Sequence, residues 1–212
     1  MRDLPHRLTF VESCRIPDDC AVLVAWPSGG GQGQIALASA IDSRGYFLTA
    51  AHCARESDLY LGYMDSSGTK LARARVVAMP ADPDRDDFAL IAVGAKVPYA
   101  FAWSDAREFA PNQAAAAVGL NFPGNRSGAR ALGLPTCVAG RVLSVQPMGK
   151  LAVRIRHNLP LRPGDSGGPL VWPDGKLIGV NTGAARGASL AIRPDLTWIA
   201  KKISDDLRRQ AP

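Results

Sequence analysis

The feature that most constrains the fold is a succession of short apolar segments, each bounded by clusters of Gly, Pro, Asp and Ser. Strands bounded in this way favour an all-β barrel or sandwich over a fold that alternates strands with long helices. The first set of predicted strands is Ala21–Trp26, Ile35–Ile41, Tyr46–Thr49, Leu59–Tyr63, Leu71–Ala78 and Phe88–Val93. After a connector at about 97–113, the second set is Ala115–Leu120, Cys137–Val145, Leu151–Arg156, Pro169–Val171, Leu177–Asn181 and Ala188–Ile192. The chain is therefore predicted to be all-β over most of its length.

The pattern changes near the C-terminus, where Leu196, Ile199, Ile203 and Leu207 recur at steps of three and four residues. This spacing places the apolar side chains on one face of a helix. A proline precedes the segment and two arginines end it, as is typical of helix boundaries. We therefore predict a helix over Asp195–Arg209.

The segment Gly164–Pro169 presents a serine, Ser166, in a glycine-lined turn where backbone N–H groups can converge on a reacting oxygen. A serine hydroxyl becomes a good nucleophile only when a base takes its proton and donors stabilise the oxyanion. The segment Thr49–Cys53 offers such a base in His52, and Asp87 places a carboxylate ahead of an apolar run. The three segments together predict nucleophilic catalysis.

With these segments in the order His, Asp, Ser, the chain resembles the chymotrypsin-like (trypsin-like) serine proteases over about residues 21–192. Subtilisin-type enzymes and α/β-hydrolases use other orders. Leu161–Pro163 before the serine and Gly179–Thr182 after it are similar to the bacterial high-temperature-requirement branch. One departure is Asp165, since that branch usually has Asn there and the digestive and secreted bacterial enzymes have Asp.

This resemblance implies two six-stranded antiparallel β-barrels and a C-terminal helix in one two-lobed peptidase domain. We expect an N-terminal arm over 1–20, a first barrel with His52 and Asp87 over 21–105, a second barrel with Ser166 over 106–193, and the helix over 194–212. The site would then lie between the lobes, where a peptide can bind in an extended form.

The resemblance also implies a role for each residue of the site. Ser166 would attack the scissile carbonyl, His52 would accept and return the proton, and Asp87 would orient the imidazole. The backbone N–H groups of Gly164 and Ser166 would form the oxyanion hole. The hydroxyl of Thr182 would support Asp87.

Other residues compete for these roles. Asp86 adjoins Asp87, but only Asp87 precedes the hydrophobic-Ala-hydrophobic run of the family, so we interpret Asp86 as a solvated loop charge. The remaining histidines, His6 and His157, are interpreted as surface or hydrogen-bonded residues. His52 is therefore the expected base.

Asp165 needs a cationic partner if it is buried, because an unpaired buried carboxylate is costly. Zymogen-activated relatives supply a new N-terminal amine, but this chain has no Ile/Val-Val-Gly-Gly start. We expect an internal arginine instead, with Arg141 the first candidate and Arg162 the second. Proteolytic activation is then not required.

The resemblance places the primary specificity pocket around the residue six before the serine, where an Asp would select Lys or Arg and where this chain has Pro160. The strand after the serine lacks the histidine of the glutamate-specific branch, having Asn181 and Thr182 instead. On the opposite wall, Ala191 is expected to point inward. The predicted substrate-binding residues are Pro160, Leu161, Thr182, Gly183, Ala184, Ser189 and Ala191. Such a pocket favours small or medium aliphatic side chains such as Ala, Val or Leu before the scissile bond.

Composition excludes several other functions. The 212 residues are 47% hydrophobic, and no apolar run approaches the roughly 18 residues of a membrane helix. The net charge of +6 is spread along the chain without a nucleic-acid-binding motif, which favours a solvated surface. No Cys/His spacing indicates a metal, and no cofactor is expected. The expected partner is a polypeptide substrate, while the oligomeric state is open.

The four cysteines are too few for a disulfide scaffold in a chain of this length. Cys14 and Cys20 could close a small peripheral loop, and Cys137 has no evident mate. In many relatives the Cys after the catalytic His bonds a Cys on the preceding strand, but the stretch at 35–39 has none. Cys53 is therefore expected to be a small buried hydrophobe.

The compartment is open at this stage. Met1–Asp19 contains charged residues and no apolar signal region, although the family is often exported, so a mature secreted form and an intracellular protease are both consistent. Two other classes also remain: a catalytically silent binding module, which would usually have lost a triad residue, and an esterase-like hydrolase, which shares the nucleophilic chemistry.

Overall fold

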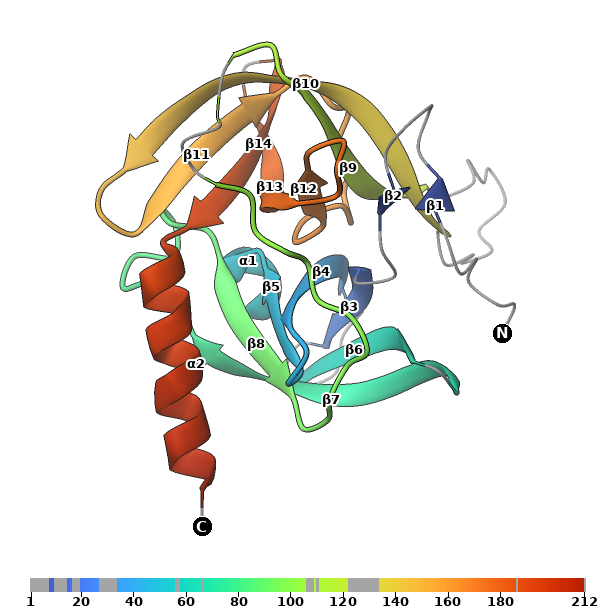
Figure 1. The fold of residues 1–212 in the computed structure, drawn as a ribbon, viewed down its shortest axis with the longest axis vertical. Coiled ribbons are helices and arrows are strands. Elements are labelled where there is room, and N and C mark those ends of the chain that lie inside the picture. Colours follow the sequence, from blue (N-terminus) through green and yellow to red (C-terminus); the bar gives the residue numbers. More distant parts are fainter. Residues whose placement is uncertain are drawn as a thin grey trace.

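The computed structural model describes residues 8–9, 15–16, 20–26, 34–55, 58–65, 67–105, 109, 111–121, 134–185 and 187–211. Two closed antiparallel barrels of six strands each lie one against the other, and a C-terminal helix runs down their side (Figure 1). A small separate sheet pairs β1 (Leu8–Thr9) with β2 (Arg15–Ile16). The predicted all-β class and two-barrel fold are confirmed.

The first barrel closes in the order β3-β4-β5-β8-β7-β6. Its strands are β3 (Cys20–Trp26), β4 (Gln34–Asp42), β5 (Tyr46–Thr49), β6 (Asp58–Asp65), β7 (Gly68–Ala78) and β8 (Ala89–Val93). Leu23, Phe47, Leu61 and Ile91 are buried inside it. β5 and β8 are buried along their whole length, which explains why both read as continuous apolar runs in the sequence.

The second barrel closes in the order β10-β11-β14-β13-β12-β9. Its strands are β9 (Ala114–Asn121), β10 (Leu134–Met148), β11 (Ala152–His157), β12 (Pro169–Val171), β13 (Leu177–Ala185) and β14 (Ala188–Pro194). Val142, Ile155, Leu170 and Ile178 fill its interior. Each observed strand overlaps its predicted range, and the β13–β14 hairpin extends further than predicted, to the pair Ala185 and Ala188.

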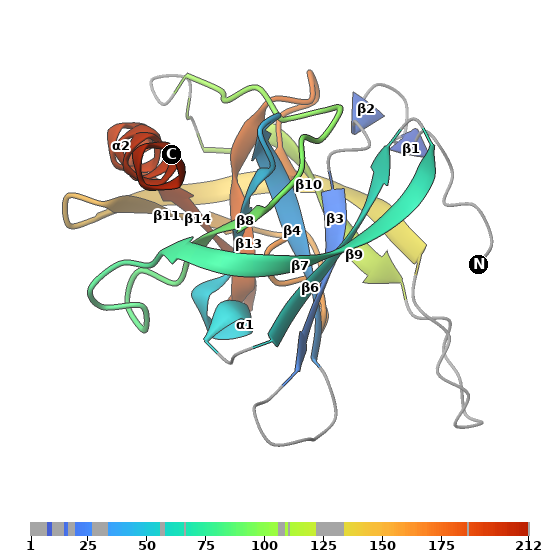
Figure 2. The same cartoon turned by 90° about the horizontal axis from the view of Figure 1, so that it is seen from below.

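The helix α2 (Leu196–Gln210) follows β14 of the second barrel but packs on the first barrel (Figures 1 and 2). Its N-cap, Asp195, accepts a hydrogen bond from the N–H of Trp198 at 2.7 Å. Ile199 and Ile203 join a core that contains both barrels' residues: Tyr46, Leu48, Phe88, Leu90, Val180 and Ile192. The helix covers an apolar face that would otherwise contact water. Burying each isoleucine contributes about 1.5–3 kcal/mol to stability.

A buried polar contact also holds α2 to the first barrel. The hydroxyl of Tyr46 donates to Asp206 Oδ2 at 2.9 Å, and Arg75 donates to both oxygens of the same carboxylate, at 2.9 and 2.6 Å. Asp206 is only 3% exposed. A buried carboxylate is tolerated when it is paired and hydrogen-bonded in this way.

The connector between the barrels is held by Arg193, a buried residue of β14. Its guanidinium donates to the hydroxyl of Ser104 at 2.9 Å and to the carbonyl of Ser104 at 2.6 Å, and it lies 5.1 Å from the ring centre of Trp103. Ser104 and Leu177 also share a backbone hydrogen bond. The path of the chain from one barrel to the other is therefore fixed by both backbone and side-chain contacts.

Cys53 is buried and carries a free thiol, so the prediction for this residue is confirmed. Cys14 and His6 lie outside the described residues. No helix among the residues in the described ranges is long and apolar enough to span a bilayer.

Candidate active site

His52 lies in a one-turn helix, α1 (Ala51–Ala54), that directly follows β5. Asp87 precedes β8, and the two strands are paired through Thr49 and Ala89. This pairing brings the two residues together: the backbone N–H of His52 donates to Asp87 Oδ1 at 2.9 Å, and Nδ1 lies 2.7 Å from Asp87 Oδ2. Because a carboxylate only accepts hydrogen bonds, Nδ1 carries the proton.

Ser166 comes from the second barrel, in the turn that leads into β12. Its Oγ lies 3.1 Å from His52 Nε2, the ring nitrogen that does not face Asp87. In the neutral tautomer that Asp87 selects, Nε2 is the free acceptor and Ser166 is the donor. The structure thus brings together the three side chains predicted from the sequence, two from one barrel and one from the other.

The turn that carries Ser166 contacts the first barrel directly. The N–H of Leu37 donates to the carbonyl of Ser166 at 2.8 Å, and the hydroxyl of Ser39 donates to the carbonyl of Gly167 at 3.1 Å. Gly167 has φ +82°, and a Cβ there would lie 2.0 Å from the carbonyl oxygen of Leu37. Only glycine fits, because any larger residue would collide with backbone that cannot move independently.

The proposed oxyanion donors lie in the same turn. Gly164 has φ +100°, a conformation that favours glycine, and the turn is closed by hydrogen bonds from Asp165 N–H to Arg162 O and from Gly168 N–H to Asp165 O. Within the described part of the chain, neither the N–H of Gly164 nor that of Ser166 donates to a partner. Both donors are therefore available for a developing oxyanion.

The carboxylate of Asp87 changes the electrostatics of the site. Its hydrogen bond raises the pKa of His52 from 6.5 to about 10, with a smaller upward effect from Cys53 and an opposing effect from burial. A stabilised imidazolium is what a base needs if it is to take a proton from a serine. The contact with Asp87 would therefore stabilise the imidazolium that forms when a neutral His52 takes the proton of Ser166.

Two expectations for neighbouring carboxylates need correction. Asp86 is not solvated but 5% exposed, and it lies in a tight turn in which its N–H donates to Asp82 O and its carbonyl accepts from Phe88 N–H. The guanidinium of Arg141 donates to the carbonyl of Asn112, at 2.6 Å, rather than extending to Asp165.

Asp165 itself is buried, which is the condition under which we expected it to need a cationic partner. Its Oδ2 accepts a hydrogen bond from the backbone N–H of Arg162 at 2.7 Å. The second candidate, Arg162, thus contacts Asp165 through its main chain. This contact fixes the carboxylate under the turn that presents Ser166.

A cavity of about 310 Å³ lies where the specificity pocket was predicted. Pro160, Leu161, Ala184 and Ser189 line it, as expected, together with Asn158, Leu159, Ala185, Gly187 and Ala188. All of these side chains are uncharged. Among the described residues, the cavity therefore presents no charged side chain to a substrate.

Three predicted pocket residues do not line this cavity. Ala191 is fully buried in the core of the second barrel, because it pairs with Ile155 on the interior face. Thr182 and Gly183 lie where the β13–β14 register shifts between Asn181 and Gly183. This irregularity turns the hydroxyl of Thr182 to the carbonyl of Leu190, 3.5 Å away, so Thr182 does not support Asp87 as we expected.

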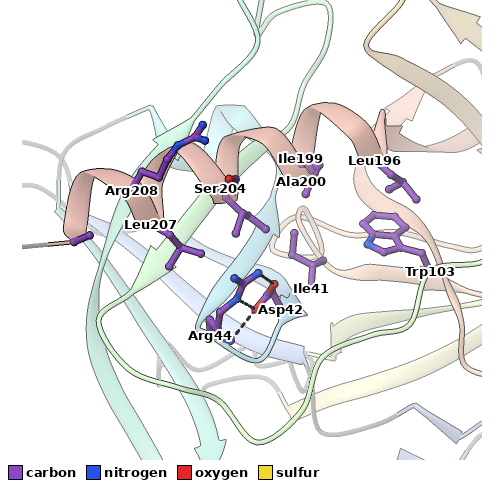
Figure 3. Close-up of a pocket in the computed structure, with 12 residues that line it drawn as sticks. Ile41, Asp42, Arg44, Trp103, Leu196, Ile199, Ala200, Ser204, Leu207 and Arg208 are labelled. Carbon is purple, nitrogen blue, oxygen red and sulfur yellow. Dashed lines mark hydrogen bonds and ion pairs between the residues drawn. The ribbon is translucent and has the colours of Figure 1, made fainter.

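A second cavity, of about 520 Å³, lies along α2 (Figure 3). Its walls are the apolar side chains of Ile41, Trp103, Leu196, Ile199 and Leu207, and the ion pair of Arg44 with Asp42 lies among them (Figure 3). None of the catalytic candidates lines it. Among the described residues, no group of three or more His, Cys, Asp or Glu side chains could hold a metal ion.

Sequence reasoning missed the part played by Leu37 and Ser39. Leu37 acts through its backbone N–H, which no residue type signals. Ser39 is a buried polar residue on an apolar strand. A polar residue in such a position needs a hydrogen-bond partner, and this pattern could have indicated its contact with Gly167.

Two closed six-stranded barrels with this site between them define the chymotrypsin-like protease fold. The sequence matches the trypsin-like peptidase domain over residues 36–180, a range that contains His52, Asp87 and Ser166. The chain therefore belongs to the trypsin-like peptidase domain family.

Solved structures of HtrA-type proteases share the fold. The protease AlgW with a tripeptide is 20% identical, with a TM-score of 0.68, over 86% of this chain and 58% of the other. AlgW with a decapeptide is 18% identical, with a TM-score of 0.67, over 89% and 64%. The chain thus spans about three fifths of the length of these proteases. A comparison with curated proteins gave no match.

Proposed function

We propose that the protein is a serine endopeptidase that hydrolyses peptide bonds through Ser166, His52 and Asp87. The observation that carries the proposal is the continuous contact from Asp87 to His52 at 2.7 Å and from His52 to Ser166 at 3.1 Å. Contacts of this length are within reach for proton transfer. The family membership and the protease fold support the same activity.

In the proposed mechanism, Ser166 Oγ attacks the scissile carbonyl while its proton passes to His52 Nε2. Asp87 stabilises the resulting imidazolium, and the N–H groups of Gly164 and Ser166 donate to the oxyanion. His52 then gives the proton to the leaving amine, which leaves an acyl-enzyme on Ser166. Water, activated by the same imidazole, hydrolyses the ester and restores the free serine.

The proposed substrate is a polypeptide in extended form. The related AlgW structures hold a tripeptide and a decapeptide, which supports this substrate class. The described residues that line the cavity, among them Pro160, Leu161 and Ala184, are uncharged, which supports a preference for small or medium aliphatic side chains such as Ala, Val or Leu before the scissile bond. Cleavage of a peptide library mainly after Arg, Lys or Glu would overturn this assignment.

The test of the activity is Ser166→Ala, measured by hydrolysis of casein and of a peptide library. We expect hydrolysis to be abolished and the fold retained, because one hydroxyl is removed and little packing changes. Ser43→Ala is the matched control, since it removes an exposed hydroxyl from a turn outside the site. Wild-type-like turnover by Ser166→Ala would refute the role of this serine.

A fluorophosphonate probe, used together with the casein assay, separates the peptidase from the two alternative classes. A fluorophosphonate probe should label wild-type protein at Ser166, and casein should be cleaved at the same time. A silent binding module would give neither result, and an esterase-like hydrolase would react with the probe and with esters but leave peptides intact. The complete Ser166, His52 and Asp87 geometry favours the peptidase over a silent module.

A further inference from the structure

The cavity proposed as the specificity pocket is lined by a polar side chain that the sequence did not assign to it, Asn158. The preceding strand, β11, ends at His157, which is fully buried and has no hydrogen-bond partner for either ring nitrogen within the described residues. The expectation that His157 is a surface or hydrogen-bonded residue is therefore wrong. Asn158 follows directly, is exposed, and begins the loop that leads to Ser166. The chain thus passes from the barrel interior to the cavity wall within one residue.

Asn158 is held in place by strand β10. Its backbone N–H donates to the carbonyl of Arg141 at 3.1 Å, and its side-chain oxygen, Oδ1, accepts from the backbone N–H of Arg141 at 2.7 Å. The side chain lies over Gly140, since a Cβ on this glycine would be 2.5 Å from Oδ1. The glycine therefore provides the space that the amide of Asn158 occupies.

The contact with Arg141 fixes the orientation of the Asn158 amide. A backbone N–H donates only to an acceptor, so the atom that faces Arg141 is Oδ1, and the other branch of the amide is the donor Nδ2. Within the described part of the chain, no group accepts a hydrogen bond from Nδ2. Because Asn158 lines the cavity and its oxygen is engaged, Nδ2 is the polar atom that it can offer to a bound side chain.

A second polar side chain, Ser189, lines the cavity from β14. Its hydroxyl donates to the carbonyl of Leu159. A hydroxyl has a single proton, so the lone pairs of Ser189 Oγ are left as acceptors. Asn158 and Ser189 therefore give the cavity one donor and one acceptor, while the other described lining residues have no polar side chain.

We propose that Asn158 is a specificity-determining residue, whose Nδ2 donates to an oxygen at the tip of the substrate side chain before the scissile bond. A carboxamide carries both an acceptor oxygen and a donor NH2 group, so the side chain of a substrate asparagine complements Asn158 and Ser189 together. Asparagine also has nearly the shape of leucine and fits the same space. The cavity then takes Asn in addition to aliphatic residues. This inference deepens the proposed peptidase function and rests on it.

The comparison of Asn with Leu is informative because the two side chains differ in polarity and hardly in size. A purely apolar pocket rejects Asn, since an amide that is buried without hydrogen bonds loses its hydration and gains nothing in return. A pocket with a matching donor and acceptor replaces the lost water. The ratio of the two rates therefore reports whether Nδ2 reaches the substrate.

The first measurement is kcat/KM for two peptides that differ only in Leu or Asn before the scissile bond. For the wild-type protein we expect the two values to lie within about 10-fold of one another. Asn158→Leu removes Nδ2 and should lower the Asn-to-Leu ratio by about 10-fold, the effect of one lost hydrogen bond. This variant also leaves the N–H of Arg141 without its acceptor, but the ratio is measured on one protein and does not depend on the folded fraction.

Asn158→Asp separates a role in specificity from a role in the fold. Aspartate keeps an oxygen for the N–H of Arg141, and its second oxygen replaces Nδ2, so a negative charge enters the cavity while the contact with β10 is retained. We expect cleavage after Lys to rise by about 10-fold or more relative to cleavage after Leu, because the carboxylate attracts the ammonium group. Asn112→Asp is the matched control, since it adds the same charge on an exposed turn outside the cavity and should leave the preference unchanged.

The outcomes are distinguishable from failure of the proposed function. If the wild-type protein cleaves no peptide, the peptidase assignment fails, and the inference that rests on it fails too. If the wild-type protein cleaves after Leu but Asn158→Asp gains no cleavage after Lys, Asn158 does not reach the substrate side chain and its role in specificity is refuted. An Asn-to-Leu ratio that is the same in the wild-type protein and in Asn158→Leu would refute the hydrogen bond from Nδ2.

Discussion

The N–H of Leu37 in the first barrel donates to the carbonyl of Ser166 in the second at 2.8 Å. The proposed nucleophile is therefore held in place by the backbone of the barrel that carries its proposed base. Ser39 adds a second contact, to Gly167. Because these bonds cross between the lobes next to the Ser166 hydroxyl, the 3.1 Å contact of Ser166 with His52 depends on how the barrels dock.

Gly167→Ala should abolish peptidase activity. The new Cβ would lie 2.0 Å from the carbonyl oxygen of Leu37 at a φ of +82°, so the turn would have to move away from the first barrel. Gly68→Ala is the control, since Gly68 also has a positive φ, +112°, but a Cβ there meets nothing within 4 Å. The measurement is kcat/KM at matched folded fractions. Equal effects of the two substitutions would show that backbone strain alone, and not the contact with Leu37, explains the loss.

The activity should rise with pH, because His52 accepts a proton only when it is neutral. Asp87 raises the pKa of His52 from 6.5 to about 10, so the rise should extend well above pH 6.5. Asp87→Asn should lower the activity strongly and move the midpoint of the rise to lower pH. The measurement is a profile of kcat/KM against pH for both proteins, and a profile that is flat from pH 5 to 10 would contradict the role of His52.

The same shift has a consequence for stability. Because folding raises the pKa of His52, protonation of this residue favours the folded state. The resulting contribution to stability is fully present below pH 6.5, the ordinary pKa of the imidazole. This contribution is lost as the pH rises through about 10, where the folded state releases the proton. The free energy of unfolding should therefore decline over this alkaline window in the wild-type protein and less in Asp87→Asn.

Asp206→Asn should destabilise the protein at neutral pH by about 1–2 kcal/mol, a value that allows for solvent around the half-exposed Arg75. The hydrogen bonds from Arg75 lower the pKa of Asp206 from 3.8 to about 2. Its contribution is thus present above pH 3.8 and is lost as the pH falls towards 2. Urea unfolding at several pH values measures this. Asp205→Asn, the same change on the exposed side of α2, should have little effect, and equal losses in both variants would contradict the assignment.

A mild thiol reductant should leave activity and melting temperature unchanged. Cys53 is a free, buried thiol next to His52, so no disulfide at this residue holds the site together. Any bridge between Cys14 and Cys20 would be peripheral. Collapse of activity in reductant, with no other change of conditions, would show that an essential disulfide exists elsewhere in the chain.

The sequence was sufficient to predict those features that depend on local pattern. Apolar runs between turn residues marked the strands, and the motifs around His52, Asp87 and Ser166 marked the candidate site. It failed where the outcome depends on how strands meet in space. The hydroxyl of Thr182 turns to Leu190 because of a register shift, and Ala191 faces the barrel core because it pairs with Ile155.

The packing of α2 has a consequence for how the chain folds during synthesis. Tyr46, Leu48 and Phe88 leave the ribosome long before Ile199 and Ile203, yet all of them share one core. The nascent first barrel therefore keeps an uncovered apolar face until α2 is made, and such surfaces are where chaperones bind and aggregation begins. The two-barrel domain is consequently completed only after α2 has been made.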